Sequence, residues 1–246
     1  MGSTPIDRER LAELIERERA TLAARTTRSR ALAERANAHM IGGVPMQWMQ
    51  IWAGQHAIFF DRAKGNRIVD VDGNELIDFC LGDTGAMAGH SPDATVAAVQ
   101  RRMGDLGGVT TMLPTEDAIW VADELSRRFG MAKWTFSLTA TDANRWVLRT
   151  CRQLTGRPKV LIYSYCYHGS VDETIIALED GVPTMKPGNV GPAVDPAETT
   201  RVVEFNDLAM LERELAHGDV ACVLAEPALT NMGIVLPDPG YWEAAT

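Results

Sequence analysis

The feature that most constrains the fold is a regular alternation of β-rich and helix-forming segments from residue 134 onward. In chain order these segments are WTFSL, DANRWVLRTCRQLTG, KVLIYS, TRVVEF, a helical stretch at 207–216 and VACVLAE. Strands that alternate with helices form parallel sheets with crossover helices. The second half of the chain is therefore predicted to be α/β, with a partial parallel (mixed) sheet. The Pro- and Gly-rich stretch GVPTMKPGNVGPAVDPAE predicts a long loop.

The first part of the chain has a different pattern. Thr4 as N-cap and Pro5 at the first helical position predict a helix start, and apolar spacing extends the helix to about Ala38, with a break near Thr26. The KGN and DGN turns then separate three runs rich in β-formers, which predicts an antiparallel β-meander.

Two further helices are expected between the meander and the parallel sheet. The first is predicted to begin at an N-cap on Ser91, and the second to end at Gly130. We therefore predict a helical and meander segment over 1–90, part of a small domain, followed by a sheet-bearing domain over 91–246.

Composition limits the possible partners. The net charge of −9 disfavours nucleic acid, because affinity for a phosphate backbone comes from clustered Lys and Arg. No apolar run approaches the ~20 residues of a membrane span, and the N-terminus has no apolar signal core, so we expect a cytoplasmic protein without a membrane partner.

The cysteines do not form a recognisable framework. Cys80, Cys151, Cys166 and Cys222 are scattered without a CxxC pair, which is typical of reduced thiols. A metal site from Cys166, His168 and Asp172 is an alternative, but no ligand pair has zinc-finger spacing. We predict no metal.

Small hydroxyl residues stand where the WTFSL segment meets the following helix. Backbone N–H groups at a helix start lack intrahelical acceptors and lie at the positive end of the helix dipole, so the turn at 139–141 suits a phosphate group. Ligands of open parallel sheets bind beyond the carboxyl ends of the strands, and this turn follows such an end.

Two other strand ends carry polar residues. Tyr167 and Gly169 after KVLIYS could stack on a flat ring and allow close backbone approach; a half-buried Tyr with a hydrogen-bonded His168 is the structural alternative. Glu226 follows the apolar VACVLA, so its carboxylate must be hydrogen-bonded, paired or raised in pKa; a helix cap or structural ion pair is equally possible.

These stretches resemble motifs of the class III pyridoxal-phosphate-dependent aminotransferases, which include glutamate-1-semialdehyde aminomutase. LTATDAN is similar to NSGTEAN, YHG matches the family's triplet, and EPALTNMGIVLPDPGY resembles EPvxgNxGxxxPxxGf. Upstream, IGGV, DVDGNELIDF and AGHSPDATVAAV resemble PGGV, DxDGxxyiDf and xGHxhPxvxxAv. The resemblance runs in order from Ile41 to Tyr241. It implies a fold type I transferase, pyridoxal 5'-phosphate as cofactor, a homodimer, and amino transfer between an amino acid or amine and a keto acid.

The resemblance also implies residue roles. The phosphate loop would be Thr139, Ala140 and Thr141, with Ala140 in place of the usual Gly and Asp142 in place of the usual Glu. Tyr167 would stack on the pyridine ring with His168 and Gly169 beside it. Glu226 would lie behind the cofactor, and Asn231 would reach toward its phenolic oxygen.

Substrate contacts are harder to assign. Some relatives carry a carboxylate-binding Arg shortly after PGGV, whereas GGVPMQWMQIW has none. Trp48 in this stretch is a candidate pocket wall, with a core position as the alternative. Asp83, Thr84 and Met112 lie in segments that approach the active site in the family.

Two catalytic residues of the family have no counterpart here. The Schiff-base Lys and the Asp that keeps the pyridine nitrogen protonated are expected beyond residue 246, so the chain would be the N-terminal part of a longer protein. The four lysines lack the family context, although Lys186 in the long loop stays possible.

Other functions remain open at this point. A racemase or aminomutase uses the same cofactor motifs, and a protein of this fold could bind the cofactor without catalysis. A nicotinamide dehydrogenase is disfavoured, because no GxGxxG follows a strand.

Overall fold

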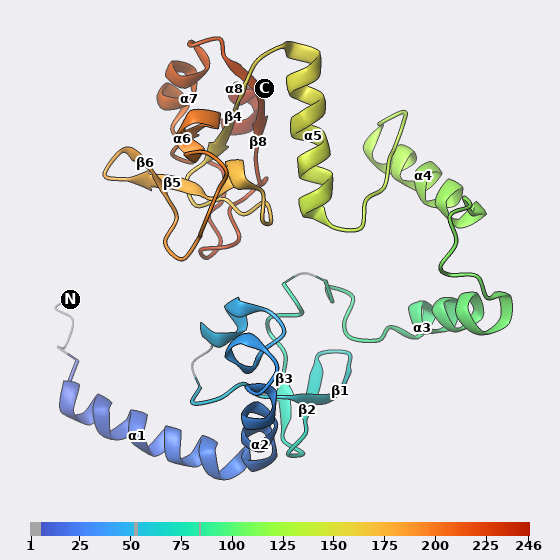
Figure 1. Cartoon of the computed structure of the whole chain (residues 1–246), viewed down its shortest axis with the longest axis vertical. Helices are drawn as coiled ribbons and strands as arrows, with labels where there is room; N and C mark the ends of the chain where they lie inside the picture. The colour runs from blue at the N-terminus through green and yellow to red at the C-terminus, as the bar shows by residue number, and fades with distance from the viewer. Residues whose placement is uncertain (1–5, 52–53, 84) are drawn as a thin grey trace. The chain divides into compact units, whose positions relative to one another are not determined.

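The computed structural model describes residues 6–51, 54–83 and 85–246 (Figure 1). The chain divides into two compact units, Met1–Pro114 and Thr115–Thr246, and each is described by itself. The functional domains predicted over 1–90 and 91–246 remain a prediction.

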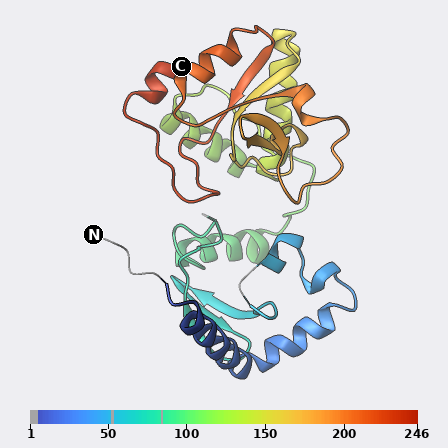
Figure 2. The ribbon, with the colours of Figure 1, turned by 90° about the vertical axis from the view of Figure 1, so that its left-hand side faces the viewer.

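The first unit begins with two helices, α1 (Arg8–Arg25) and α2 (Thr27–Ala36), which change direction at Thr26 as predicted (Figures 1 and 2). The cap of α1 is Asp7, whose carboxylate accepts from the Arg10 N–H at 3.0 Å. The predicted start at Thr4 and Pro5 lies outside the described residues. Two 3-10 turns follow, η1 (Ile41–Gly43) and η2 (Gln47–Ile51).

The predicted meander is present. Its strands are β1 (Phe60–Lys64), β2 (Arg67–Asp70) and β3 (Glu75–Ile77), paired antiparallel in the order β1-β2-β3. The next helix, α3 (Asp93–Gln100), continues into a π-helical turn, η3 (Arg101–Leu106).

The predicted cap of α3 on Ser91 is wrong, because the helix begins one residue later with Pro92 as its N-cap. Reciprocal backbone bonds between Gly65 and His90 hold the preceding residue in a β-bridge. Ser91 takes a left-handed φ of 50° as the chain leaves that bridge, a conformation that an N-cap residue does not have.

The second unit has two longer helices, α4 (Glu116–Phe129) and α5 (Ala140–Thr155). Each ends at a glycine in the left-handed conformation, Gly130 and Gly156, and the predicted stop at Gly130 is confirmed. The segment at 134–138 between them is not a strand, contrary to expectation. No described segment pairs with it, and a strand needs a hydrogen-bonded neighbour.

The parallel sheet has the order β7-β4-β8, from β7 (Thr200–Val203), β4 (Lys159–Tyr163) and β8 (Val220–Leu224). The central strand β4 runs parallel to both neighbours, so all three carboxyl ends lie at one edge. Helix α5 packs on β8, and α7 (Leu208–Leu215) packs on β7. The predicted α/β class is confirmed.

The stretch predicted as one long loop contains more structure. Its first part belongs to an antiparallel hairpin of β5 (Ile176–Glu179) and β6 (Val182–Met185), joined by Asp180 and Gly181 with φ of 50° and 78°. Such left-handed pairs form the tight turns of hairpins, and Asp-Gly is a typical sequence for them. Short helical segments complete the unit: η4 (Asp172–Thr174), α6 (Pro196–Thr199) and α8 (Tyr241–Ala245).

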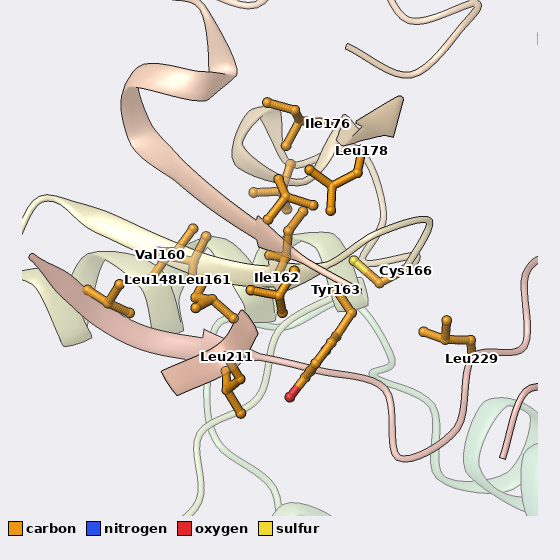
Figure 3. Packing of buried hydrophobic residues seen from close by; sticks show 14 of the residues in the cluster. Leu148, Val160, Leu161, Ile162, Tyr163, Cys166, Ile176, Leu178, Leu211 and Leu229 are labelled. Carbon is orange, nitrogen blue, oxygen red and sulfur yellow. The ribbon is translucent and has the colours of Figure 1, made fainter. Parts of the chain in front are cut away.

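The core of the second unit surrounds β4 (Figure 3). Four consecutive residues of this strand, Val160 to Tyr163, are fully buried. The Tyr241 hydroxyl donates to the Tyr163 hydroxyl at 3.1 Å, and Phe205 and Trp242 complete an aromatic cluster around these rings. Burial raises the pKa of Tyr163. The turn that follows β4 therefore starts from a rigid base.

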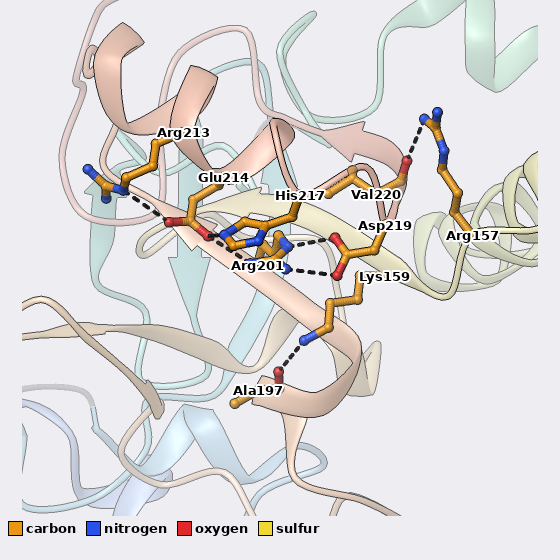
Figure 4. Close-up of polar contacts among 9 residues, drawn as sticks. All are labelled: Arg157, Lys159, Ala197, Arg201, Arg213, Glu214, His217, Asp219 and Val220. Atoms are coloured by element: carbon orange, nitrogen blue, oxygen red, sulfur yellow. Dashed lines mark hydrogen bonds and ion pairs between the residues drawn. The ribbon is translucent and has the colours of Figure 1, made fainter.

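A polar network lies at the opposite, amino-terminal edge of the sheet (Figure 4). Arg201 forms two bonds to Asp219, at 2.7 and 2.8 Å, and one to Glu214 at 2.9 Å. Its guanidinium holds the pKa of Asp219 below the usual range. Ion pairs stabilise this amino-terminal edge of the sheet, whereas the candidate site lies at the carboxyl edge.

Candidate functional site

The first turn of α5 has the geometry of an anion site. Thr139 is the N-cap; its hydroxyl accepts from the Asp142 N–H at 3.1 Å and donates to the Asp142 carboxylate at 2.9 Å. Ala140 is the first helical residue and has no left-handed φ, so alanine fits where the family has glycine. The N–H groups of Ala140 and Thr141 have no intrahelical acceptors and lie at the positive end of a 16-residue helix.

Gly169 lies directly against this helix start. A Cβ atom at residue 169 would be 2.0 Å from the Thr141 Oγ1 atom, and the residue has a φ of 78°. The Thr141 hydroxyl also accepts from the Ser170 N–H at 3.2 Å. Only glycine fits both the conformation and the space, so the turn lies in close contact with the helix start.

Side chains from three other parts of the unit bind the backbone of residues 166–170. These bonds are Lys186 Nζ to the Cys166 carbonyl (2.6 Å), Tyr167 N–H to Glu226 (2.9 Å), Asn144 Nδ2 to the His168 carbonyl (3.0 Å), Ser170 N–H to Thr141 (3.2 Å) and Arg145 Nη2 to the Ser170 carbonyl (3.1 Å). Several bonds therefore hold the backbone of this turn in place, whereas Tyr167 itself is 61% exposed. An exposed aromatic ring carried by a fixed backbone can serve as a stacking platform.

Glu226 fastens this turn to the end of β8. One carboxylate oxygen accepts from the Tyr167 N–H, and the other accepts from the Thr230 hydroxyl at 2.8 Å and the Thr230 N–H at 3.3 Å. The carboxylate is thus hydrogen-bonded, one of the outcomes expected for a charge at the end of an apolar strand.

His168 has an unsatisfied ring nitrogen. The residue is 7% exposed, and its Nε2 atom has no hydrogen-bond partner within the described part of the chain. Burial lowers the pKa of His168, while Glu226 and a backbone hydrogen bond with Leu224 act in the opposite direction. A buried, neutral imidazole with an unpaired nitrogen indicates a place for a bound group or water.

A cavity of about 320 Å³ adjoins the turn. Its lining includes Tyr167, His168, Gly169, Asn231 and Lys186. Burial lowers the pKa of Lys186, and it raises the pKa of the neighbouring Cys166 thiol to about 11. The cavity thus combines an aromatic wall, amide and imidazole groups and one cation.

The candidate substrate residues lie in the first unit. Trp48 is in η2 and is half-exposed, Met112 is fully exposed, and the Asp83 carboxylate accepts from the Cys80 thiol at 3.1 Å. Thr84 is outside the described residues. The roles of these four residues remain predictions.

Sequence reasoning assigned no supporting role to four residues that hold the site together: Asn144, Arg145, Lys186 and Thr230. It singled out Lys186 only as a possible cofactor-bearing lysine. Asn144 is the last residue of the LTATDAN stretch, so the motif itself contained a signal for it. Arg145 and Lys186 donate to backbone carbonyls distant in sequence, which no local pattern reveals. Thr230 donates to the Glu226 carboxylate four residues earlier.

The arrangement fits a flat cofactor with an anionic group. The helix start offers N–H donors, Gly169 permits close approach, Tyr167 presents a ring, and the His168 Nε2 atom lacks a partner. The described residues contain no group of three or more His, Cys, Asp or Glu side chains that could hold a metal ion. Across 6–51, 54–83 and 85–246, no helix is both long and apolar enough to span a membrane.

Comparison with known families decides the assignment. Residues 49–246 match the family model Aminotransferase class-III. The chain belongs to the class III aminotransferases. This match confirms the predicted family. It also confirms the predicted cofactor of that family, pyridoxal 5'-phosphate. The assignment of individual residues to that cofactor remains a prediction.

Named relatives of this class III chain fall into two groups. It is 36% identical over 229 residues to glutamate-1-semialdehyde 2,1-aminomutase of Symbiobacterium thermophilum, covering 90% of this chain and 52% of that protein. A glutamate-1-semialdehyde-aminomutase variant from Pseudomonas aeruginosa PAO1, in complex with PMP, is 44% identical with a TM-score of 0.92, covering 98% and 53%. An omega-transaminase from Sphaerobacter thermophilus is 29% identical with a TM-score of 0.79, covering 87% and 50%. The chain spans about half the length of the curated relatives it matches.

Proposed function

We propose that the full-length class III protein transfers an amino group from an amino acid or amine to a keto acid with pyridoxal 5'-phosphate. The observation that carries this proposal is the meeting of three segments at the carboxyl edge of the sheet. The start of α5 touches Gly169 through Thr141, and Glu226 binds the Tyr167 N–H. Amino transfer needs a cofactor that is held firmly while substrates exchange.

Each residue of the site has a proposed task. The N–H groups of Ala140 and Thr141 bind the phosphate, together with the Thr141 hydroxyl, whose proton remains free because its oxygen accepts from Ser170. The hydroxyl of Thr139 is already engaged with Asp142, so its contribution is to cap the helix. Because these donors are fixed before binding, little ordering is needed when the phosphate arrives.

The ring of the cofactor is assigned to the turn after β4. Tyr167 stacks on one face, Gly169 leaves space beside it, and the His168 Nε2 atom offers a buried polar contact. Glu226 acts from behind by fixing the turn, and Asn231 shares the same cavity wall. When bound, pyridoxal phosphate supplies a reactive carbonyl and an electron sink.

We propose that the Schiff-base lysine and the pyridine-binding aspartate lie beyond residue 246. Lys64 and Lys159 are occupied elsewhere, with Asp93 and with the Ala197 carbonyl, and Lys133 is exposed in a loop. The amine of Lys186 is held by two backbone carbonyls. The expected homodimer and the cytoplasmic location also remain proposals.

Borohydride reduction tests this function. The full-length protein is incubated with pyridoxal 5'-phosphate and reduced with borohydride. Its intact mass is then measured, and the modified residue is located by peptide mass spectrometry. The expected result is one pyridoxyl group on a single lysine outside residues 1–246. Cofactor binding without any reducible adduct would instead indicate a non-catalytic binding protein.

An aminomutase is the second candidate, because several relatives carry that name. An aminomutase moves the amino group within one molecule and consumes no acceptor. Incubation with amino donors, with and without a keto acid, separates the two: a transaminase forms product only when the acceptor is present. A racemase would invert an amino acid under both conditions without forming a keto product.

A further inference from the structure

Lys186 makes two backbone contacts that neither the motif nor the proposed chemistry requires. Its ammonium donates to the Cys166 carbonyl at 2.6 Å and to the Thr174 carbonyl at 2.9 Å. Its own backbone N–H donates to the Ile175 carbonyl at 2.7 Å. The residue therefore joins the strand β6 side of the hairpin to the turn after β4.

The Cys166 carbonyl and the Tyr167 N–H belong to one peptide unit. Lys186 donates to the carbonyl, and Glu226 accepts from the N–H at 2.9 Å. Carbonyl and N–H point in opposite directions across a trans peptide, so a cation and an anion hold this plane from its two sides. Both bonds are charge-assisted, which makes them stronger than neutral hydrogen bonds.

This peptide plane sets the direction of the next side chain. Tyr167 carries the exposed ring, and the peptide plane in front of it, together with the φ angle of the residue, sets where its Cα–Cβ bond points. Asn144 and Arg145 bind later carbonyls of the turn, those of His168 and Ser170.

We propose that Lys186 is a positioning residue for the cofactor site, which together with Glu226 orients the Cys166–Tyr167 peptide and thereby the stacking ring of Tyr167. The inference rests on the proposed function, because it concerns the same site. It also gives the one lysine in this cavity a role other than carrying the cofactor. Lys186 lines the cavity and is partly withdrawn from water, which strengthens both of its bonds.

The test uses the full-length protein with the variants K186M and K186R. PMP (pyridoxamine 5'-phosphate) is the probe, because it has no aldehyde and cannot react with lysines. K186M is expected to raise the Kd for PMP about tenfold, the equivalent of one charge-assisted hydrogen bond. K186R keeps the charge and the donors and should recover most of the affinity.

The matched control is K159M. Lys159 is also a partly buried lysine that donates to a backbone carbonyl, that of Ala197 at 3.1 Å, but it begins β4 at the edge away from the site. Its loss should leave the Kd for PMP unchanged. Hydrogen exchange provides a second readout: in K186M the Tyr167 amide should exchange faster, while amides of the core strand β4 keep their protection.

Three results would overturn the inference. The first is a K186M protein that binds PMP as wild type does and shows unchanged exchange at the Tyr167 amide, and the second is a borohydride-stable pyridoxyl group on Lys186. If the wild-type protein bound no PMP, the proposed function would fail, and the exchange of the Tyr167 amide would still decide whether Lys186 orients the turn. The third overturning result is faster exchange across β4 as well as the turn, because it would indicate general loss of stability.

Discussion

At the scale of single residues, the contact between Gly169 and Thr141 is the most exacting in the site. Gly169→Ala would place a methyl group 2.0 Å from the Thr141 hydroxyl oxygen, so the helix start and the turn would have to separate. The separation moves phosphate donors away from the stacking ring. We expect the Kd for PMP, measured by fluorescence titration, to rise at least tenfold.

Gly181→Ala is the matched control for this substitution. Gly181 has the same φ of 78° but nothing within 4 Å of a Cβ atom. Both variants should lose about 1–2 kcal/mol of stability from the left-handed conformation, whereas only Gly169→Ala should lose affinity. Equal PMP affinity in the two variants would refute the steric explanation.

Tyr167 is predicted to act through its ring rather than its hydroxyl. Replacement by Leu removes an aromatic contact of about 0.5–1.5 kcal/mol, which corresponds to about a two- to tenfold higher Kd for PMP. Tyr167→Phe keeps the ring and should bind as wild type does. A loss in the Phe variant as large as in the Leu variant would contradict stacking.

His168 should make stability depend on pH. Its pKa in the folded protein is lowered by burial, so the unfolded chain binds the proton more readily. Its contribution is present above the ordinary histidine pKa of about 6.5 and is lost as pH falls through the lower folded value. Urea unfolding between pH 5 and 7 should show a smaller pH slope for His168→Gln than for wild type; an equal slope would contradict a buried, neutral imidazole.

At the scale of secondary-structure elements, Arg201 joins β7 to the start of β8 and to α7. Arg201→Met would leave Glu214 and Asp219 partly buried without their shared cation. Because the side chains retain some exposure, we expect the free energy of unfolding to fall by about 2 kcal/mol. This is less than the ~3–5 kcal/mol expected when a fully buried pair is broken. The contribution of Asp219 is present above its usual pKa, because Arg201 lowers that pKa, and it is lost as pH falls.

Arg213→Met tests whether position in the network matters. Arg213 pairs with the same Glu214 carboxylate at 3.3 Å, but its side chain is mostly exposed. Exposed pairs contribute about 0–1 kcal/mol, so its loss should change the midpoint of urea unfolding little. If both substitutions lowered stability by similar amounts, the burial of Arg201 would not explain its contribution.

The sequence predicted those elements whose signals are local. The meander, the helix stop at Gly130 and the strands β4, β7 and β8 follow from turn residues and apolar runs, and these are present. The segment 134–138 has a strand-like composition but no partner among the described residues, and pairing is a non-local property. The hairpin was missed although Asp180-Gly181 is a local signal, because the surrounding Pro and Gly favoured a loop.

The candidate site shows the same division. Tyr167, His168, Gly169 and Glu226 could be selected from strand ends and motifs, and Thr139 and Thr141 from the motif and the helix start that they form. Several of the bonds that fix them come from Arg145 and Lys186, which donate to the backbone carbonyls of Ser170 and Cys166. Hydrogen bonds to backbone groups place few demands on sequence pattern, so only the folded chain reveals them.

At the scale of the whole molecule, β8 pairs with β4 alone among the described strands. Val223 on this strand is exposed, and an apolar strand with one free edge promotes association. In the 246-residue polypeptide, Val223→Lys is expected to lower concentration-dependent light scattering. Val190→Lys, an equally apolar exposed position in a loop, is the control and should have little effect. Equal scattering of both variants would exclude the edge of β8 as the cause.

The close approach of residues 141 and 169 also limits how this site can change over evolutionary time. A side chain larger than hydrogen at 169 is acceptable only after the atoms at 141 have withdrawn, and a bulkier residue at 141 closes the same space from the other side. Neither position can drift independently. Substitutions that reshape this corner of the cofactor site must therefore arise as a pair, or in one permitted order, and lineages that lost the glycine should carry a compensating change in the first turn of the helix.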